Sequence, residues 1–390
     1  MTQVLLILGV ILALPGAMTA VHLSALALAS LFYREPIAEH PVPRLRFLVL
    51  IPAHNEEAVL GRTLAAVKRA LRPGDLVLVV DDRSVDRTAA IAREYDAMVL
   101  QRTPDQEPGR AAARQDGLRL GLTVGWDAVA MIDADSVVEP EYLDACEAVL
   151  ASGAMAVQAR SEAAAGGGVL SQTFLAAFAL QSVTIPRGRD RLGLSVRLKG
   201  TGMVVRREIA QHYRFRGPGA SEDLCFSLDL CRNGILPRHA ESAHLRSESA
   251  ASVGTASGQR RRWEAGRLLM AREHVGALLR RHDPAAIEAA VHLVTPPFAL
   301  AALSLAAGGV LLAAGGGTLL ARASALLLGL LIVDLVIALI EARAAIATWF
   351  ALLTAPAYVL WKLWVHAGAV ITVIRREKLF PATVRESERH

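Results

Sequence analysis

Two aspartates in the middle of the chain have a spacing that suits metal chemistry. Asp133 and Asp135 are two residues apart, so in an extended segment both carboxylates point the same way and repel each other. A divalent cation relieves that repulsion, and Mg²⁺ or Mn²⁺ takes its oxygen ligands from one or two carboxylates together with substrate phosphates. The spacing therefore indicates a metal site, with capping of a helix near Pro140 as the alternative interpretation.

Two further acidic pairs suit hydrogen bonding and proton transfer. Asp81 and Asp82 follow an apolar run, where a carboxylate can accept hydrogen bonds from a nucleotide base or ribose. Asp223 follows Ser221 and Glu222, and a carboxylate in a desolvated site can serve as a general base for a hydroxyl. For both pairs, capping of the helix that follows is the alternative interpretation.

A third group has the i, i+3, i+4 spacing of a single helical face and consists of Gln259, Arg262 and Trp263. A guanidinium group binds phosphate through paired hydrogen bonds, and an indole ring stacks on a sugar or supports the arginine. A basic juxtamembrane helix in contact with anionic lipid is the alternative. The group therefore indicates either a diphosphate site or a helix that meets the membrane.

Other basic residues could also bind either a diphosphate or a membrane surface. Arg110 and Arg114 begin a predicted helix whose amino end suits a diphosphate, with a solvated helix face as the alternative. Further along the chain lies a basic stretch made of Arg187, Arg189, Arg191 and Arg197. It fits either a membrane surface or a diphosphate, and the sequence leaves that choice open.

Alternating β-rich and helical segments predict how these residues are positioned. Apolar runs typical of buried parallel strands alternate with helical stretches from residue 47 onward. The order predicts an α/β fold with a doubly wound parallel sheet, in which ligands bind beyond the carboxyl ends of the strands. The acidic pairs at 81–82 and 133–135 follow such strands, so we expect them on one rim. The predicted strands are 47–51, 76–80, 97–100 and 128–132, and the predicted helices are 56–71, 84–95, 109–122 and 140–150.

Apolar segments at both ends of the chain predict attachment to a membrane. Residues 4–33 contain no Asp, Glu, Lys or Arg, and a spanning helix needs about 20 apolar residues. Residues 291–313 and 318–340 repeat the signal. Basic residues after the first segment and in the tail place the middle of the chain and the tail in the cytoplasm. We therefore expect 345–374 to be interfacial or re-entrant, with a third full span as the alternative.

The composition argues against several classes of protein. Lys and Arg number 42 against 37 Asp and Glu, so the net charge is +5, without the concentrated basic stripe of a nucleic-acid binder. Three cysteines, Cys146, Cys225 and Cys231, fit neither a disulfide framework nor a metal motif, and they indicate a reducing compartment. Hydrophobic residues make up 53% of the chain, which argues against intrinsic disorder.

Taken in order, the motifs resemble the membrane-bound family-2 glycosyltransferases, such as cellulose synthases and ceramide glucosyltransferases. The resemblance covers about residues 45–270 and implies a Rossmann-like GT-A domain that binds a nucleotide-diphosphate-sugar, expected to be a UDP-sugar, together with Mg²⁺ or Mn²⁺. It also implies transfer with inversion at the anomeric carbon. The motifs are Phe47–Glu57, Val79–Asp82, Asp133–Ser136, Ser221–Asp223 and Gln259–Trp263.

The resemblance implies a role for each motif. It makes Asp223 the catalytic base, assigns Asp133 and Asp135 to the metal, and likens Gly200–Met203 to a loop on the acceptor side. The residues implied to contact the nucleotide-sugar are Pro52, Asn55, Glu57, Asp81, Asp82, Arg110, Asp133 and Asp135. The residues implied to hold the diphosphate and the acceptor are Glu222, Gln259, Arg262 and Trp263. Arg83 departs from the family, which often has glycine there.

These inferences combine into one expected organisation. It consists of a membrane anchor over 1–34, a cytoplasmic GT-A domain over 45–290, apolar helices over 291–374 and a basic tail over 375–390. Such a protein would be a metal-dependent hexosyltransferase of the inner membrane that acts on a lipid or polysaccharide acceptor, with no nucleic-acid partner. The alternative is a catalytically inactive regulatory subunit that binds nucleotide-sugar at the membrane. A transporter would need more spans than the sequence provides.

Overall fold

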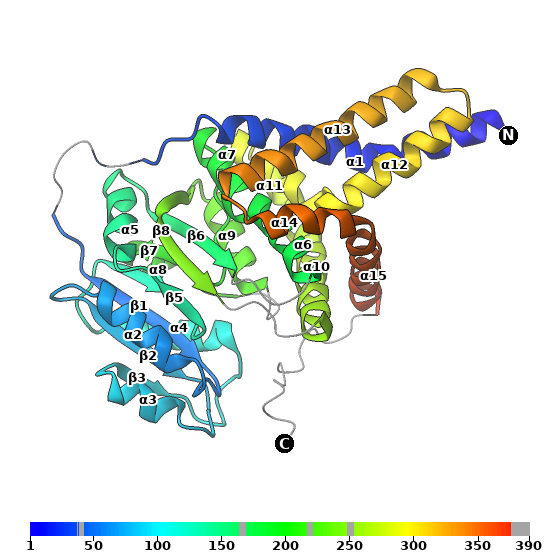
Figure 1. Cartoon of the computed structure of the whole chain (residues 1–390). Helices are drawn as coiled ribbons and strands as arrows, with labels where there is room; N and C mark the ends of the chain where they lie inside the picture. The colour runs from blue at the N-terminus through cyan, green and yellow to red at the C-terminus, as the bar shows by residue number, and fades with distance from the viewer. Residues whose placement is uncertain (37, 39–42, 164–168, 217–220, 248–252, 376–390) are drawn as a thin grey trace.

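A sheet domain lies beside a group of long helices in the computed structural model of the protein (Figure 1). The structure describes residues 1–36, 38, 43–163, 169–216, 221–247 and 253–375, without the side chains of 169–171 and 253–256. The predicted basic tail, apart from Arg375, lies outside the described residues. Within the described part, one eight-stranded sheet has the strand order β3-β2-β1-β4-β7-β6-β8-β5.

The first half of the sheet is parallel, as the alternation of strands and helices predicts. β1 lies between β2 and β4, and β3 pairs with the far side of β2, all in parallel. All seven residues of β1 are buried, because helices cover both faces of this part of the sheet. The strands are β1 (Phe47–Ala53), β2 (Leu76–Asp81), β3 (Met98–Gln101) and β4 (Ala128–Met131).

Helices on the two faces of the sheet bury alternate residues of β1. Phe47, Val49 and Ile51 pack with the apolar sides of α2 and α5 on one face. Leu48 and Leu50 pack with α4, α8 and α9 on the other face. The helices are α2 (Leu60–Ala70), α3 (Thr88–Glu94), α4 (Arg110–Gly121), α5 (Tyr142–Ala151), α8 (Arg207–His212) and α9 (Glu222–Arg232).

The second half of the sheet is mixed in direction. β7 runs antiparallel to β4 and β6, β8 runs parallel to β6, and β5 runs antiparallel to β8. Most strands still point the same way, which confirms a mostly parallel sheet. β5 begins directly after Asp135, so the two aspartates precede a strand, and the interpretation of that pair as a helix cap is wrong. The strands are β5 (Ser136–Val138), β6 (Ala156–Ala163), β7 (Met203–Arg206) and β8 (Arg238–Ser247).

Three helices among the described residues are long and apolar enough to cross a membrane. They are α1 (Thr2–Ser30), α13 (Thr318–Glu341) and the segment Ile346–Ile374. A further pair, α11 (Pro284–Val294) and α12 (Phe298–Ala314), passes the same test together but is bent by 70°. The expected continuous span at 291–313 is therefore broken, because the backbone before and at the prolines 296–297 disfavours a helix.

The last helical segment differs in direction from the other long helices. α1 packs against α12 and α13, and these three run side by side away from the sheet domain (Figure 1). The segment 346–374 contains α14 (Ile346–Ala351), a 3₁₀ turn and α15 (Ala355–Ile374), and α15 runs across the direction of those three in this view. Its interfacial or re-entrant placement stays a prediction. The remaining helices are α6 (Val169–Ala179), a π-helical turn (Leu180–Thr184), α7 (Ile185–Arg191) and α10 (Val253–Leu279).

Candidate functional site

The loops at the carboxyl ends of β1 and β2 are tied to each other. Asn55 has a φ of 53°, which asparagine tolerates, and its Oδ1 accepts the Val85 N–H at 2.9 Å. Glu57 Oε2 accepts the Arg87 N–H at 3.0 Å. The side chains of Asn55 and Glu57 therefore shape the rim of the sheet. Pro52 is a buried residue of β1, so its ring is part of the packed sheet.

Asp81 and Asp82 are almost fully buried, with 2% and 6% of their surface exposed. Asp81 Oδ1 accepts the Ser84 N–H at 3.0 Å, so this side chain closes its own loop. Asp82 accepts from Arg102 Nη1 at 2.6 Å and from the Gly109 N–H at 2.9 Å, which fixes the amino end of α4. Neither aspartate caps the next helix, because α3 begins several residues later, so the capping interpretation is wrong here. The sequence analysis did not single out Arg102.

Asp133 is held between two arginines of α4. Arg110 Nη1 lies 3.2 Å from Asp133 Oδ2, and Arg114 Nη2 lies 3.1 Å from Asp133 Oδ1. Arg114 is fully buried, and its Nη1 also donates to Glu222 Oε1 at 3.1 Å. Burial raises the pKa of Glu222, and Arg114 opposes that shift. Arg114 therefore bridges β4 and α9 inside the protein, so a solvated helix face is the wrong interpretation for it, whereas Arg110 is 52% exposed.

Side chains from separate motifs converge at Gly200. A Cβ placed on this glycine would lie 3.4 Å from Arg110 Nη1, 3.4 Å from Arg114 Nη2 and 3.8 Å from Asp223 Oδ2. The carboxylates of both acidic motifs, 133–135 and 222–223, raise the pKa of Arg110, with Asp133 as the strongest. The structure thus brings together two motifs that are far apart in the chain, together with the amino end of α4.

Asp133 and Asp135 fit a divalent cation by their chemistry. Their carboxylate oxygens are the kind of ligand that Mg²⁺ and Mn²⁺ prefer. Among the described residues, the group at Gly200 contains four carboxylates but two guanidinium groups, so a cation would reduce the repulsion. Thr201 Oγ1 accepts the Asp133 N–H at 3.1 Å and lies 3.1 Å from Ser136 Oγ. The turn that carries the aspartates is therefore fixed to the loop at Gly200.

A close contact between α9 and α10 brings the third motif to this place. A Cβ on Gly266 would lie 1.6 Å from Ser221 Oγ and 2.9 Å from Ser221 Cβ, so a larger residue would displace Ser221 at the start of α9. Gly266 lies in the same helix as the predicted face, one to two turns further along. The face made of Gln259, Arg262 and Trp263 therefore lies near the acidic pair at the start of α9.

Two arginines of this region repel each other. Burial lowers the pKa of Arg262, and the charges of Arg261 and Arg110 lower it further. The charges of Arg262 on α10 and Arg110 on α4 therefore act on each other, and an anion such as a diphosphate would relieve that repulsion. Trp263 is 50% exposed, so its ring is available to a sugar or to lipid, and that alternative stays open.

Residues of α6 and α15 hold α10 in place. The Arg260 guanidinium carbon lies 3.9 Å from the centroid of the Phe174 ring and 5.0 Å from that of the Trp361 ring. Glu264 Oε1 accepts from Lys362 Nζ at 2.7 Å, and this carboxylate is buried. The sequence analysis missed Glu264, although its i, i+3 spacing from an arginine is a weak signal for an ion pair.

The basic stretch 187–197 turns inward in its first part. Arg187 Nη2 donates to Glu241 Oε1 at 2.6 Å, and Arg189 Nη2 donates to Glu288 Oε1 at 2.8 Å. These two arginines therefore join α7 to β8 and α11, and they face neither lipid nor a diphosphate. Arg191 is exposed at the end of α7.

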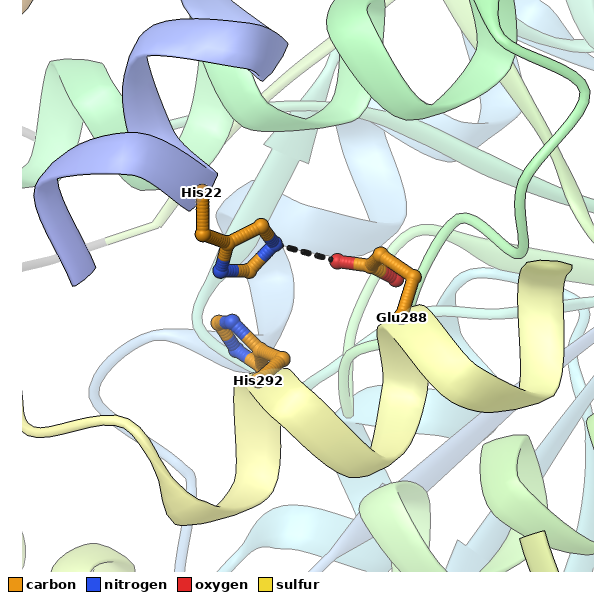
Figure 2. A group of neighbouring side chains, drawn as sticks. All are labelled: His22, Glu288 and His292. Carbon is orange, nitrogen blue, oxygen red and sulfur yellow. Dashed lines mark hydrogen bonds and ion pairs between the residues drawn. The ribbon is translucent and has the colours of Figure 1, made fainter. Parts of the chain in front are cut away.

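A second group of metal-ligating residue types lies where α1 meets α11 (Figure 2). Donor atoms of His22, Glu288 and His292 lie within 4.8 Å of one another, and His22 Nε2 lies 2.8 Å from Glu288 Oε1. Arg189 binds the same carboxylate oxygen, so its charge is already neutralised. We therefore interpret this group as a partly buried polar network that fixes α1 against α7 and α11.

Comparison with known proteins relates this arrangement to sugar transfer. The sequence profile of a family described as Glycosyltransferase like family 2 matches residues 43–266. The probable glycosyltransferase YdaM of Bacillus subtilis is 34% identical over 115 residues, which cover 27% of this chain and 26% of that protein. Undecaprenyl-phosphate mannosyltransferase of Micrococcus luteus is 38% identical over 104 residues, which cover 25% of this chain and 42% of that protein. The chain therefore matches less than half of the length of these relatives.

A solved structure shares the architecture over almost the whole chain. The mannosyltransferase PcManGT of Pyrobaculum calidifontis, in complex with GDP-Man and Mn²⁺, has a TM-score of 0.61 and 16% sequence identity. The alignment covers 94% of this chain and 99% of that one. Together with the family match, this similarity confirms the predicted Rossmann-like GT-A fold.

Proposed function

Because this chain belongs to glycosyltransferase family 2, we propose that it moves a sugar from a nucleotide-diphosphate-sugar, specifically a UDP-sugar, to an acceptor at the membrane. The observation that carries the proposal is the convergence of Asp223, Arg110 and the carboxylates of 133–135 at Gly200. A general base, cations for a leaving diphosphate and oxygen ligands for a metal are the parts that such a transfer needs.

The mechanism assigned to these residues is an inverting, in-line displacement. Asp223 takes the proton of the acceptor hydroxyl as that oxygen attacks the anomeric carbon. Arg110 and Arg262 bind the diphosphate oxygens, on which negative charge grows as the bond to the sugar breaks. Mg²⁺ or Mn²⁺ held by Asp133 and Asp135 would neutralise part of that charge. Attack from the face opposite the diphosphate inverts the anomeric centre.

The buried aspartates after β2 serve the donor in a different way. Asp82 already binds Arg102 and the amino end of α4, so we assign it to positioning Arg110 at the diphosphate and to closing the nucleotide pocket. Asp81 shapes the loop beside it. Asn55 and Glu57 fix the facing loop and thereby the opposite wall of that pocket.

We assign a membrane-bound acceptor because the helices next to the site include apolar ones. α10 is held by α15, and α1 and α13 are apolar enough to cross a bilayer. The Micrococcus luteus relative is named for a lipid phosphate, which supports a lipid acceptor or a lipid-borne growing polysaccharide. The proposal places the catalytic domain on the cytoplasmic side of the inner membrane.

The test is sugar transfer by the full chain, purified in detergent. It is incubated with a panel of labelled UDP- and GDP-sugars, membrane lipid extract and Mn²⁺, Mg²⁺ or EDTA. We expect one UDP-sugar to label an extractable product, and only when a divalent cation is present. If the chain binds nucleotide-sugars but transfers none of the sugars tested, the result would instead favour the alternative function of a catalytically inactive regulatory subunit. Selection of a GDP-sugar would contradict the assignment of the nucleotide.

A further inference from the structure

The segment between α7 and β7 carries an arginine that the mechanism above does not use. The Val196 N–H bonds to the Pro237 carbonyl at 3.0 Å, and the Leu198 N–H bonds to Ser227 Oγ of α9 at 3.1 Å. Val196 and Leu198 are buried, whereas the intervening Arg197 lies on the other side of the segment. The segment is therefore fixed beside α9, only a few residues before Gly200.

Arg197 has no partner among the described residues. Its Nε is buried without a hydrogen bond, and no carboxylate, carbonyl or hydroxyl of the described chain binds its guanidinium group. Arg187, Arg189 and Arg267 differ, because each of them binds a glutamate. Withdrawing part of a guanidinium group from water without an anionic partner is unfavourable, so such a group is retained where a ligand supplies the missing anion.

The surroundings of Arg197 link the catalytic base to the apolar helices. Burial lowers the pKa of Arg197, and Asp223 is the carboxylate that opposes this shift most strongly. Lys199, the next residue on the same side, donates to the Gln181 carbonyl at 3.1 Å, and its Nζ lies 5.7 Å from the centroid of the Phe178 ring. Both contacts lead away from Gly200 toward α6, which packs against α13 and α14.

We propose that Arg197, assisted by Lys199, binds a phosphate of the acceptor, and that the acceptor is a membrane lipid that carries its first sugar through a phosphate or diphosphate. This inference rests on the proposed sugar transfer. The phosphate stays on Arg197 while a hydroxyl of the lipid-borne sugar attacks the donor. A glycosidic C–O bond forms, the donor C–O bond to phosphate breaks with its electron pair, and the proton passes to Asp223.

The occupant is a phosphate-bearing lipid because of charge and position. Arg110 and Arg262 are assigned above to the donor diphosphate, so Arg197 is left for a second anion. An uncharged sugar chain would leave the partly buried Arg197 guanidinium group without an anionic partner. A lipid enters from the apolar helices and brings its phosphate to the boundary between those helices and the sheet domain.

A binding measurement tests the inference independently of catalysis. The full chain in detergent is titrated calorimetrically with three ligands, which are geranylgeranyl diphosphate, geranylgeraniol and UDP. Each titration is carried out on the wild type, on Arg197→Met and on the control Arg191→Met, which changes an exposed arginine. We expect the wild type and the control to bind the diphosphate at least tenfold more tightly than the alcohol. We expect Arg197→Met to lose that preference and to bind UDP unchanged.

Thermal melting separates a ligand-binding arginine from a structural one. Methionine keeps the aliphatic packing and removes a partly buried charge that has no partner, so Arg197→Met should melt at the same temperature as the wild type or higher. A lower melting temperature would show that Arg197 stabilises the fold. Equal binding of alcohol and diphosphate by the wild type, or an equal loss of UDP affinity in Arg197→Met, would also overturn the inference.

Kinetics of the active enzyme complete the test. Once the donor is known, we expect Arg197→Met to raise the KM for a polyprenyl diphosphate-linked sugar at least tenfold and to leave the KM for the donor unchanged. Equal use of the same sugar on an uncharged alkyl chain would refute the phosphate requirement. Absence of transfer with every donor would refute the proposed function, while the titrations would still decide the role of Arg197.

Discussion

The donor and acceptor regions proposed around Asp223, here called the donor side and the acceptor side, differ in how their charges are balanced. On the donor side, Arg110 and Arg114 both bind Asp133, and Asp82 binds Arg102. On the acceptor side, Arg197 binds no carboxylate of the described chain. Around Gly200, the four carboxylates of 133–135 and 222–223 outnumber the guanidinium groups of Arg110 and Arg114, which suits a substrate that arrives with a cation. The acceptor side has an excess of positive charge, which suits a substrate that arrives as an anion.

This difference also separates two kinds of arginine. Arg114 is fully buried and holds β4 and α9 together, so its charge is part of the framework. Arg197 is held by its backbone neighbours, and its charge is left for a ligand. Removing the first should damage the fold, and removing the second should damage binding alone. The following experiments break or sharpen that contrast, from the largest expected effect to the smallest.

The largest effect is expected from Asp223→Asn, which removes the proposed catalytic base. A positioned base contributes about 10²–10⁴-fold to rate, so transfer should fall by that factor. The amide keeps the size of the side chain, so UDP affinity should stay the same. Asp96→Asn, at an exposed surface carboxylate, serves as the control. Wild-type turnover in Asp223→Asn would refute its role as the base.

The framework role of Arg114 predicts a loss of stability. Arg114→Met leaves Asp133 and the buried Glu222 without their shared cation, and breaking a buried ion pair from one side costs about 3–5 kcal/mol. Urea unfolding of the detergent-purified chain measures the change. The control is Arg119→Met on the same helix, because that arginine is 65% exposed. Equal stability of the two variants would contradict the bridge.

The metal assignment predicts a shift in cation dependence. Asp135→Asn removes one proposed ligand next to Asp133, so the Mn²⁺ concentration for half-maximal transfer should rise at least tenfold. The measurement is a Mn²⁺ titration of transfer at saturating donor, with Asp144→Asn at an exposed carboxylate as the control. An unchanged titration would remove Asp135 from the metal site.

The smallest effect is a pH dependence on the acceptor side. Burial, together with Arg197 and Arg189, lowers the pKa of Lys199 to about 7, and Asp223 opposes this. Lys199 is therefore charged below that pH and neutral above it, so affinity for a phosphate-bearing lipid should fall as the pH rises from about 6 to about 8. In Lys199→Met, the affinity for the phosphate-bearing lipid should no longer fall over this pH range. A profile that keeps its slope in the variant would exclude Lys199 as its source.

Hydrophobic patterning predicts the parallel half of the fold well. The runs at 47–51 and 76–80 are apolar throughout, because both faces of a parallel sheet are covered. β8 reads Arg-His-Ala-Glu-Ser-Ala-His-Leu-Arg-Ser and shows no such run, so the mixed half could not be predicted. The bend between α11 and α12 had a visible cause in Pro296 and Pro297, which interrupt an otherwise apolar stretch.

Only those residues of the candidate site that belong to a local sequence motif could be predicted. The acidic motifs follow strand ends or a helix start, and the chain order alone indicates that they share a rim. Partners such as Arg102 for Asp82, or Arg114 for Glu222, lie 20 and 108 residues away in the chain. No local pattern in one sequence identifies such pairs. That Arg197 has no hydrogen-bond partner among the described residues can be recognised only from the three-dimensional structure.

The contact between α10 and α15 has a consequence for anyone who wants a soluble form of this enzyme. A piece cut near residue 290 would retain Gln259, Arg262 and Trp263 but lose Lys362 and the ring of Trp361. The helix that carries the proposed diphosphate contacts would then lack its outer support. Detergent-free preparations of the catalytic part should therefore be designed to keep that last helix, or to replace it.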